Sequence, residues 1–302
     1  MYFPFEKQIR GCYNCAKSER DEAMPVVISA DSACDLFPSL YRERGIELVP
    51  LYISLGGETR RDMFEISPDE LFSADGKSPL PKTSAPPPID FFELFRKSTQ
   101  GGASVVHFAM NSRFSSSYQN ACIAAKEFQN VFVVDTHTLS SAEGLLALRA
   151  ADRRDAGMPA EKIYLAAEED SRRVRAYVLL DSLDYAYRGG RASMLQMFGA
   201  NLLRLRPCLL LDTEGRLSVV KKFRGNFAQV CREYARFVLA RPDADSGRAF
   251  VTTTGMDSRL FHEIVGMVEK SGKFRKVLTS RAGCAMSTHA GPGALVIFYL
   301  SK

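Results

Sequence analysis

The segment ASVVHFAMNSRFSSSYQNACIAAKEF, residues 103–128, decides the fold. Residues 103–110 form an apolar run with β-branched side chains, which is typical of a buried strand. Residues 115–128 place apolar side chains at helical spacing. A strand that leads through a Ser-rich loop directly into a helix predicts one parallel β–α unit of an α/β protein.

The same alternation continues on both sides of this segment. Ser67-Pro68-Asp69-Glu70 predicts a helix start, because it has a capping Ser, Pro at the first helical position and Glu three residues after the cap. Residues 55–62 are expected to form a loop or a small excursion before this helix, and residues 213–215 a hairpin turn. Further strands are expected at 26–29, 46–54, 131–135, 175–180, 208–212, 217–223, 249–254, 276–280 and 294–300, and further helices at 89–98, 139–156, 194–204, 225–240 and 257–271.

Composition excludes several function classes. Hydrophobic residues make up 46% of the 302 residues and charged residues 25%, as in an ordinary globular protein. No apolar run has the roughly 18–20 residues of a membrane span, and the N-terminus lacks an apolar stretch like that of a signal peptide, so a cytoplasmic location is expected. The net charge of +5 is modest and its basic residues are dispersed, so no nucleic-acid partner is expected.

Cofactor and metal signatures are missing from the sequence. It contains no phosphate loop, dinucleotide fingerprint, H-E-x-x-H or G-x-S-x-G motif, so no cofactor and no metal are expected. Cys12 and Cys15 form a C-x-x-C, but no second Cys/His pair stands at zinc-site spacing, and the preferred interpretation is a tail with two reduced thiols.

Five polar segments stand at or near strand ends, where ligands bind in open α/β sheets. Hydroxyls and helix N–H groups suit an anion, paired Gly allow close backbone approach, and Arg binds carboxylate or phosphate in bidentate fashion. The first segment is expected to be a capping loop under a pocket rather than a metal site, in which Asp31 and Ser32 cap the following helix and hydrogen-bond neighbouring loops. The last segment is expected to be a rigid turn. The segments are Asp31–Leu36, 83–87, 111–118, 188–191 and 288–293.

In order along the chain, these segments resemble the DegV family, the fatty-acid-binding subunits that work with a bacterial fatty acid kinase. The resemblance runs from about Val26 to the C-terminus. It rests on DSACDL (31–36), TSAP (83–86), NSRFSSSY (111–118), DTHTLSSAEG (135–144), YRGGR (187–191) with GANLLRLRP (199–207), and THAGPG (288–293). Ser116 stands where the family has a Gly, Asn111 where it has a Ser, Pro87 where a Ser is common, and Ala142 where a Gly is common.

The resemblance implies a fold, a ligand and a partner. It implies a larger Rossmann-like domain at residues 25–172, a smaller mixed α/β domain at 173–302 and an N-terminal extension, 1–24, of unassigned role. One long-chain fatty acid, such as palmitate, stearate or oleate, would lie in a buried tunnel and be presented to a separate ATP-dependent kinase, so the chain itself would not be an enzyme. The acyl-phosphate product would be held until transfer, with peripheral membrane contact for lipid exchange.

The resemblance also assigns roles to residues. Thr83, Ser112 and Ser115 would bind the carboxylate, and Arg191 and His289 the phosphate or head group. The supporting loop residues would be Asp31, Ser32, Ser84, Gly190 and Gly291.

Two other functions are alternatives. The first is a serine hydrolase acting on a lipid ester through a hydroxyl of Ser115–Ser117, with His289 as its base. The second is a regulatory module that senses a lipid and binds nucleic acid, with an affinity that falls steeply with salt.

Overall fold

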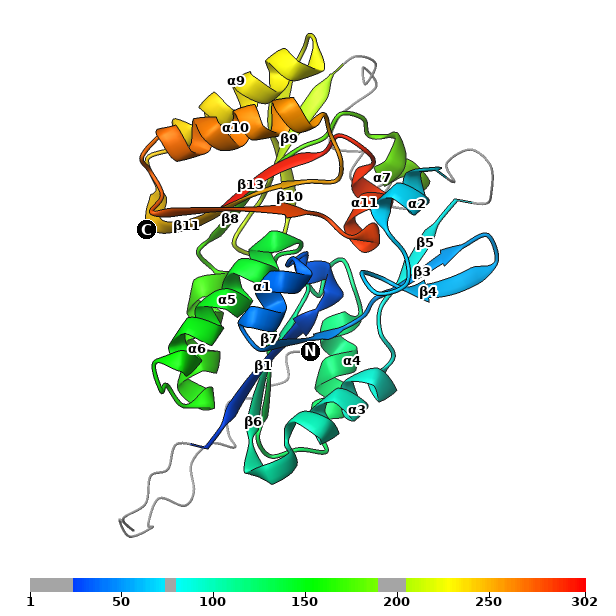
Figure 1. Ribbon diagram of the computed structural model, residues 1–302, viewed down its shortest axis with the longest axis vertical. Helices are drawn as coiled ribbons and strands as arrows, with labels where there is room; N and C mark the ends of the chain where they lie inside the picture. The colour runs from blue at the N-terminus through cyan, green and yellow to red at the C-terminus, as the bar shows by residue number, and fades with distance from the viewer. Residues whose placement is uncertain (1–23, 74–79, 190–204) are drawn as a thin grey trace, which may run out of the picture.

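The computed structural model describes residues 24–73, 80–189 and 205–302, and it contains two main sheets (Figure 1). The first is parallel throughout, in the order β2-β1-β6-β7. Its central strand β6 is buried along its whole length, as expected for a parallel sheet covered on both faces. The strands are β1 (Val26–Asp31), β2 (Ile46–Val49), β6 (Ser104–Ala109) and β7 (Val131–Asp135).

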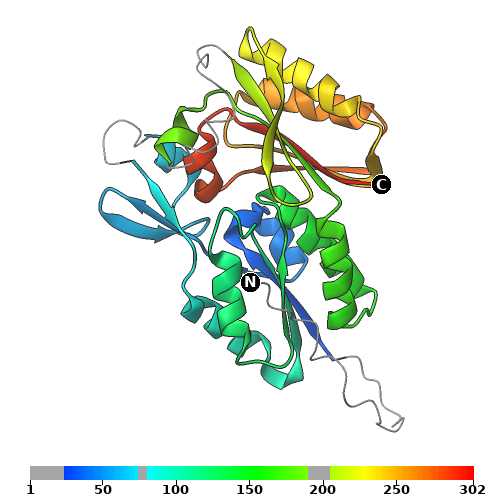
Figure 2. The same cartoon turned by 180° about the vertical axis from the view of Figure 1, so that it is seen from behind.

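The second sheet is mixed and has the order β10-β9-β8-β13-β11-β12. Helices α9 (Phe227–Leu239) and α10 (Ser258–Lys270) pack on one of its faces, seen in yellow and orange in Figures 1 and 2. The strands are β8 (Val174–Leu179), β9 (Arg206–Leu211), β10 (Leu217–Phe223), β11 (Ala244–Thr253), β12 (Lys276–Arg281) and β13 (Leu295–Ser301).

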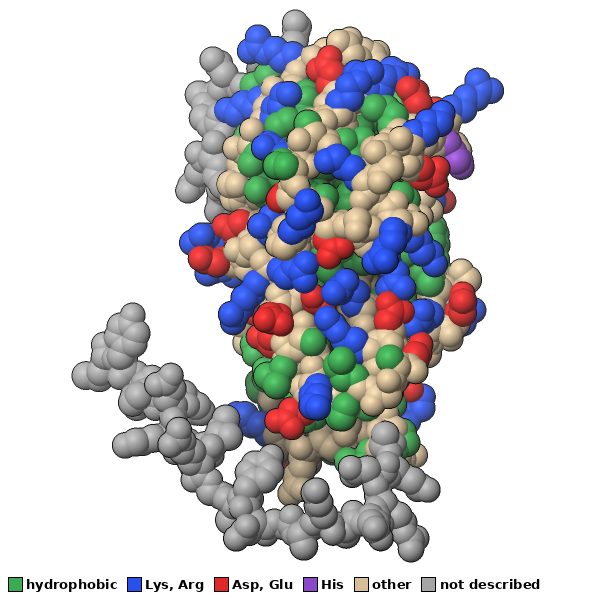
Figure 3. Space-filling view, turned by 90° about the vertical axis from the view of Figure 1, so that its left-hand side faces the viewer, with side chains coloured by type: hydrophobic (Ala, Val, Ile, Leu, Met, Phe, Trp, Pro, Cys, Tyr) green, Lys and Arg blue, Asp and Glu red, His purple; other side chains and the backbone are tan. Residues whose placement is uncertain are grey.

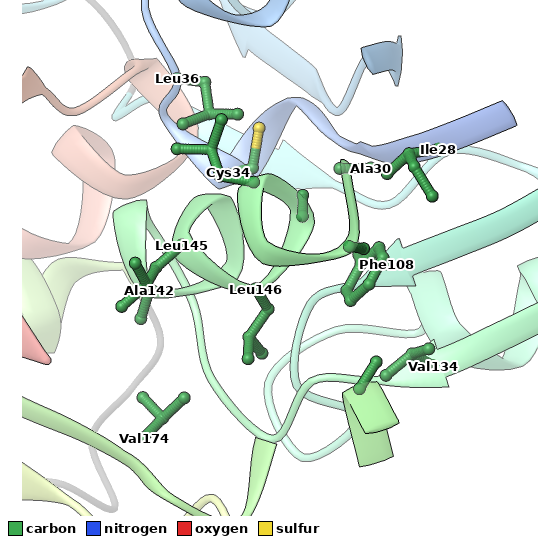
Figure 4. Close-up of a cluster of buried hydrophobic side chains, with 14 of the residues drawn as sticks. Ile28, Ala30, Cys34, Leu36, Phe108, Val134, Ala142, Leu145, Leu146 and Val174 are labelled. Atoms are coloured by element: carbon green, nitrogen blue, oxygen red, sulfur yellow. The ribbon is translucent and has the colours of Figure 1, made fainter. Parts of the chain in front are cut away.

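Helix α5 (Ser141–Asp155) joins the two sheets. It contacts β1 and β6 of the first sheet and β8, β11 and β13 of the second, so it is buried on nearly all sides. Figure 4 shows Leu145 and Leu146 of this helix among core residues of the first sheet and Val174 of the second. A Cβ at Gly144 would lie 2.6 Å from the Cys34 carbonyl oxygen, so only Gly permits this approach.

A small antiparallel sheet, in the order β4-β3-β5, lies beside the first sheet. Its strands are β3 (Tyr52–Leu55), β4 (Glu58–Arg61) and β5 (Lys82–Ser84). The expected loop or small excursion at 55–62 is a β3–β4 hairpin, in which Gly56 and Gly57 form the tight turn. The predicted helix start is confirmed at α2 (Pro68–Ser73): Ser67 Oγ accepts the Glu70 N–H, and Glu70 Oε2 accepts the Ser67 N–H.

The remaining elements complete the layers. The predicted strand 46–54 is divided, because Pro50 and Leu51 separate β2 from β3. The 213–215 hairpin turn is confirmed between β9 and β10, and helix 194–204 falls outside the described residues. The other helices are α1 (Pro38–Glu43), α3 (Pro88–Ser98), α4 (Ser117–Ala125), α6 (Ala160–Ser171), α7 (Asp184–Arg188) and α11 (Cys284–Ala290), with 3-10 turns η1 (Ser32–Cys34) and η2 (Gln100–Gly102).

These elements confirm the predicted α/β class. The first part of the chain forms a parallel sheet with helices packed on it, and the second part forms a mixed sheet with its own helices. The prediction of a rigid turn at 288–293 is wrong for its first residues. Thr288 and His289 lie in the last turn of α11, and the chain leaves the helix only at Gly291, where φ is 71°. Among the described residues, no helix is long and apolar enough to cross a membrane.

Candidate functional site

A cavity of about 380 Å³ lies between the two halves of the structure. Loops at the carboxyl edge of the first sheet form one side, and the face of the second sheet opposite α9 and α10 forms the other. This volume falls within the ~300–1,000 Å³ of small-molecule sites. The edge of a parallel sheet beyond the carboxyl ends of its strands is the expected place for such a site.

The floor of the cavity is one row of four side chains across the second sheet, three of them apolar and the fourth Thr252. Leu209 of β9 pairs with Val178 of β8, Val178 pairs with Val296 of β13, and Val296 pairs with Thr252 of β11. Because side chains directly opposite each other share a face, all four line the cavity. Leu180, Leu211, Leu217 and Ala294 extend this surface. The floor therefore offers a long apolar contact and no charge.

The polar end of the cavity contains His289 and Thr83. Thr83, on β5, places its Oγ1 2.8 Å from His289 Nε2, on α11. A Cβ at Gly189 would lie 2.5 Å from His289 Nδ1, so the backbone after α7 also packs closely on the imidazole ring. His289 is the one titratable side chain among the described residues that line the cavity. Three of the predicted polar segments thus meet at this ring.

Ser115 and Ser116 bring a fourth segment to the same cavity. Both line it, as does Ser84 beside Thr83. Ser115 Oγ accepts the Ser117 N–H at the start of α4, which leaves its own proton able to donate to a ligand. The two interpretations of this loop, helix capping and anion binding, are compatible in this geometry.

Ser112 is placed elsewhere. It lines a separate surface depression with Arg113 and His137, and its N–H donates to Asp135 Oδ1. The chain turns at this point, where the Phe114 N–H donates to the Asn111 carbonyl. Ser112 and Ser115 therefore face different sites although they are three residues apart.

Asp31 and Ser32 lie beneath the cavity rather than in it. Both are fully buried, and Asp31 Oδ2 accepts the Met110 N–H at 2.9 Å. Ser32 Oγ accepts the Leu51 N–H and donates to Asp62 Oδ2. Of the two roles expected for Asp31, the helix cap is wrong, because its side chain does not cap η1, whereas the hydrogen bond to a neighbouring loop is present, at the loop after β6.

Burial raises the pKa values of two acidic side chains beneath the cavity. Burial raises the pKa of Asp35 to about 8, although hydrogen bonds from Ser140 and Gly283 act in the opposite direction. Burial and the nearby Asp31 and Asp35 carboxylates also raise the pKa of Glu143. No group of three or more His, Cys, Asp or Glu that could hold a metal occurs within the described ranges.

The other predicted site residues are placed as follows. Gly291 is the C-cap of α11, and its carbonyl accepts a hydrogen bond from Thr254 Oγ1, which lines the cavity. Gly190 and Arg191 lie outside the described residues. Sequence reasoning missed the floor residues on β8, β9, β11 and β13, whose apolar letters look like those of any core strand. It also missed Met286 and Ala285 of α11.

The hydrolase alternative requires the His289 ring to contact a hydroxyl of Ser115–Ser117, whereas among the described residues its Nε2 lies beside the Thr83 hydroxyl. Nε2 of His289 pairs with Thr83, and Ser115 Oγ accepts the Ser117 N–H. A Ser29–His107–Asp31 arrangement does exist in the core, with Ser29 Oγ 3.0 Å from His107 Nδ1 and Asp31 Oδ1 3.4 Å from His107 Nε2. All three side chains are 0% exposed and none lines the cavity, so this arrangement cannot reach a substrate.

Comparisons with known proteins agree with this architecture. The family model described as "Uncharacterised protein, DegV family" matches residues 25–302. DegV domain-containing proteins from Caldanaerobacter subterraneus and Streptomyces coelicolor are 29% and 30% identical to this chain, over 92% of it and 99% of their own length. A fatty-acid-binding DegV-family protein from Thermus thermophilus has 29% identity and a TM-score of 0.85, covering 92% of this chain and 100% of its own. DegV from Bacillus subtilis, a fatty acid binding protein, has 26% identity and a TM-score of 0.79, covering 92% and 100%.

Proposed function

The chain belongs to the DegV family, and from that premise we propose that it binds one long-chain fatty acid in the cavity between its two halves. The observation that carries the proposal is the apolar floor from Leu209 to Val296, which ends at hydroxyls and the single His289. Fatty acids are bound by the similar proteins of Thermus thermophilus and Bacillus subtilis.

The two ends of a fatty acid match the two ends of the cavity. Each buried methylene contributes about 0.8 kcal/mol, so a chain of about sixteen carbons supplies ample driving force. A carboxylate in an apolar cavity needs several donors at once. Thr83, Ser115 and His289 supply them, with Ser84 and Ser116 beside them. Palmitate, stearate and oleate are the expected ligands.

The wider role we propose is that of a carrier for a separate kinase. The carrier would present the carboxylate, the kinase would phosphorylate it with ATP, and the carrier would hold the acyl phosphate for phospholipid metabolism in the cytoplasm, with peripheral membrane contact for lipid exchange. Arg191 and His289 would engage the phosphate. Phosphoryl transfer needs a nucleotide and metal site, and the sequence has no phosphate loop. This role is supported by the family resemblance, as is a domain boundary near residue 172, between α6 and β8.

Extraction of the purified protein, without delipidation, followed by mass spectrometry tests the ligand. About one C14–C18 fatty acid per chain is expected. Folded protein that yields none, and that stays empty after incubation with palmitate or oleate, would refute the proposal.

The carrier role needs its own experiment. Arg191→Ala should keep fatty acid binding and lose phosphorylation by the kinase, with Arg224→Ala, an exposed Arg of the same half, as the control. Loss of the lipid with unchanged phosphorylation of the residual complex would contradict the assignment of Arg191.

A further inference from the structure

Helix α11 forms one wall of the cavity, and its N-terminus is capped by the other half of the protein. Asp35 Oδ1 accepts the Gly283 N–H at 2.7 Å, across 248 residues of sequence. Asp62 Oδ1 accepts the Cys284 N–H at 2.8 Å, across 222 residues, and the Asp62 carboxylate also accepts the Ala285 N–H. The first N–H groups of a helix have no partner within the helix, so these two carboxylates supply what the sequence around α11 does not.

The same carboxylates are tied to the opposite wall of the cavity. Ser140, a lining residue, donates its hydroxyl to Asp35 Oδ2 at 2.5 Å. Ser32 donates to Asp62 Oδ2 at 3.2 Å and accepts the N–H of Leu51, which also lines the cavity. Two continuous hydrogen-bonded paths therefore run from the first-half wall of the cavity to the start of α11.

We propose that Asp35 and Asp62 are positioning residues that assemble the head-group end of the cavity, because they cap α11 from across the junction and so hold His289 within reach of Thr83. This inference rests on the proposed function, since it explains how the carboxylate-binding end is built. Neither aspartate lines the cavity or would touch the ligand.

A helix as short as Cys284–Ala290 depends on its tertiary contacts, because isolated helices of this length are not stable in water. Loss of a cap would loosen its first turn and let the helix rotate. Rotation moves the His289 ring away from Thr83, whereas the apolar floor lies on strands outside α11 and keeps its contact, so that Met286 is the one large apolar lining side chain that moves with the helix. The contacts to the carboxylate of a ligand should therefore weaken more than the contacts to its hydrocarbon chain.

The chain offers a matched control. Asp257 caps α10 from within the same element, accepting the Leu260 N–H at 2.9 Å, and it does not line the cavity. Asp257→Asn thus changes a helix cap in the same way, on a helix packed on the far face of the second sheet.

Calorimetric titration of the delipidated full chain with palmitate and with hexadecanol tests the inference. Asp62→Asn should weaken palmitate binding by about tenfold, hexadecanol should bind nearly as to the parent protein, and Asp257→Asn should change neither. Asp35→Asn, with the same expectation, serves if Asp62→Asn does not fold. An equal loss of affinity for palmitate and hexadecanol would mean that the aspartates have only a general structural role. An unchanged palmitate affinity would mean that they do not position the head-group end at all.

A readout without ligand separates this inference from the proposed function. The ring resonances of His289, assigned with His289→Gln, should shift in the Asp62→Asn or Asp35→Asn spectrum and stay in place in Asp257→Asn. Failure of the parent protein to bind palmitate would refute the proposed function alone. Unshifted His289 resonances in both aspartate variants would refute the positioning role alone.

Discussion

The Thr83 hydroxyl lies 2.8 Å from His289 Nε2, although 206 residues separate them in the sequence. This contact joins the small β4-β3-β5 sheet to helix α11 and marks the polar end of the cavity. It also holds one edge of the imidazole ring, at Nε2, while Gly189 packs against the other nitrogen. The Thr83 hydroxyl and the His289 ring are thus held in place before a ligand arrives, which lowers the entropy cost of binding.

Thr83→Val should weaken palmitate binding by about three- to tenfold, because one hydrogen bond to the carboxylate and the hydrogen bond between Thr83 and His289 are lost. The size of the side chain stays nearly constant, so hexadecanol binding should change less. Calorimetric titration with both ligands measures the difference. Thr59→Val is the control, since Thr59 bonds Ser54 in an exposed hairpin. An unchanged palmitate affinity would contradict the assignment of Thr83.

Val178→Phe should shift the bound lipids toward shorter chains. Val178 stands in the middle of the floor row, paired with Leu209 on one side and Val296 on the other. The aromatic ring of Phe would fill part of the cavity, and one methylene that no longer fits changes the free energy of binding by about 1–3 kcal/mol. Mass spectrometry of the extracted lipids gives the chain-length distribution. Val220→Phe, on the strand β10 but packed toward α9 and α10, should leave it unchanged. An unchanged distribution in Val178→Phe would show that the chain runs elsewhere.

Much of the fold follows from local sequence, and part of the site does not. The strand at 103–110 and the Ser-rich loop after it place Ser115 at the carboxyl edge of a parallel sheet by local rules alone. The pairing of Thr83 with His289 comes from tertiary structure, and only resemblance to a family predicted that both serve one site. Ser112 and Ser115 cannot be told apart in sequence, because one turn of the chain decides which of them faces the cavity.

Helix α11 shows why sequence reasoning missed a wall of the cavity. Apart from Met286, its residues are small or polar, Cys284–Ala290, and its N-terminus has no capping side chain of its own. The caps come from Asp35 and Asp62, which no local pattern links to it. The floor residues were missed for a different reason: a cavity-lining Val and a core Val give the same periodicity.

Between about pH 4 and about pH 8 the protein should lose stability as the pH rises, in part through Asp35. Its pKa is about 8 in the folded protein and 3.8 as an ordinary value, so in this window the folded state binds a proton that the unfolded state has released. One such proton lowers the free energy of unfolding by up to about 1.4 kcal/mol per pH unit. Below the window both states are protonated, and above it neither is, so the slope should vanish at both ends.

Asp35→Asn should remove this contribution and flatten the pH dependence. Urea unfolding at pH 5, 6, 7 and 8 measures the slope for both proteins, and Glu127→Gln, an exposed acid on the first half, should keep the parent slope. The raised pKa values of Glu143 and Asp62 act in the same direction, so a smaller slope should remain in Asp35→Asn. A slope identical to that of the parent would show that Asp35 does not keep its proton on folding.

Tyr234→Phe should destabilise the second half by about 1–3 kcal/mol while the cavity stays intact. The hydroxyl of Tyr234, on α9, donates to the Tyr177 carbonyl at 2.5 Å and accepts the Ile297 N–H at 2.8 Å. Tyr177 and Ile297 are paired on β8 and β13, so this one hydroxyl bridges a donor and an acceptor of the sheet. Tyr234 is 0% exposed, and loss of its hydroxyl would remove one hydrogen bond from each of these two backbone groups at a place away from water.

Urea unfolding of Tyr234→Phe against Tyr187→Phe measures this effect, because Tyr187 is 60% exposed and its hydroxyl should contribute little. The side chains of Tyr177 and Ile297 lie on the face of the sheet that α9 covers, whereas Val178 and Val296 line the cavity. Palmitate affinity should therefore stay at the parent value under native conditions. A Tyr234→Phe protein as stable as the parent would mean that Ile297 and Tyr177 bond each other directly once the hydroxyl is gone, and that the bridge contributes nothing beyond the sheet's own hydrogen bonds.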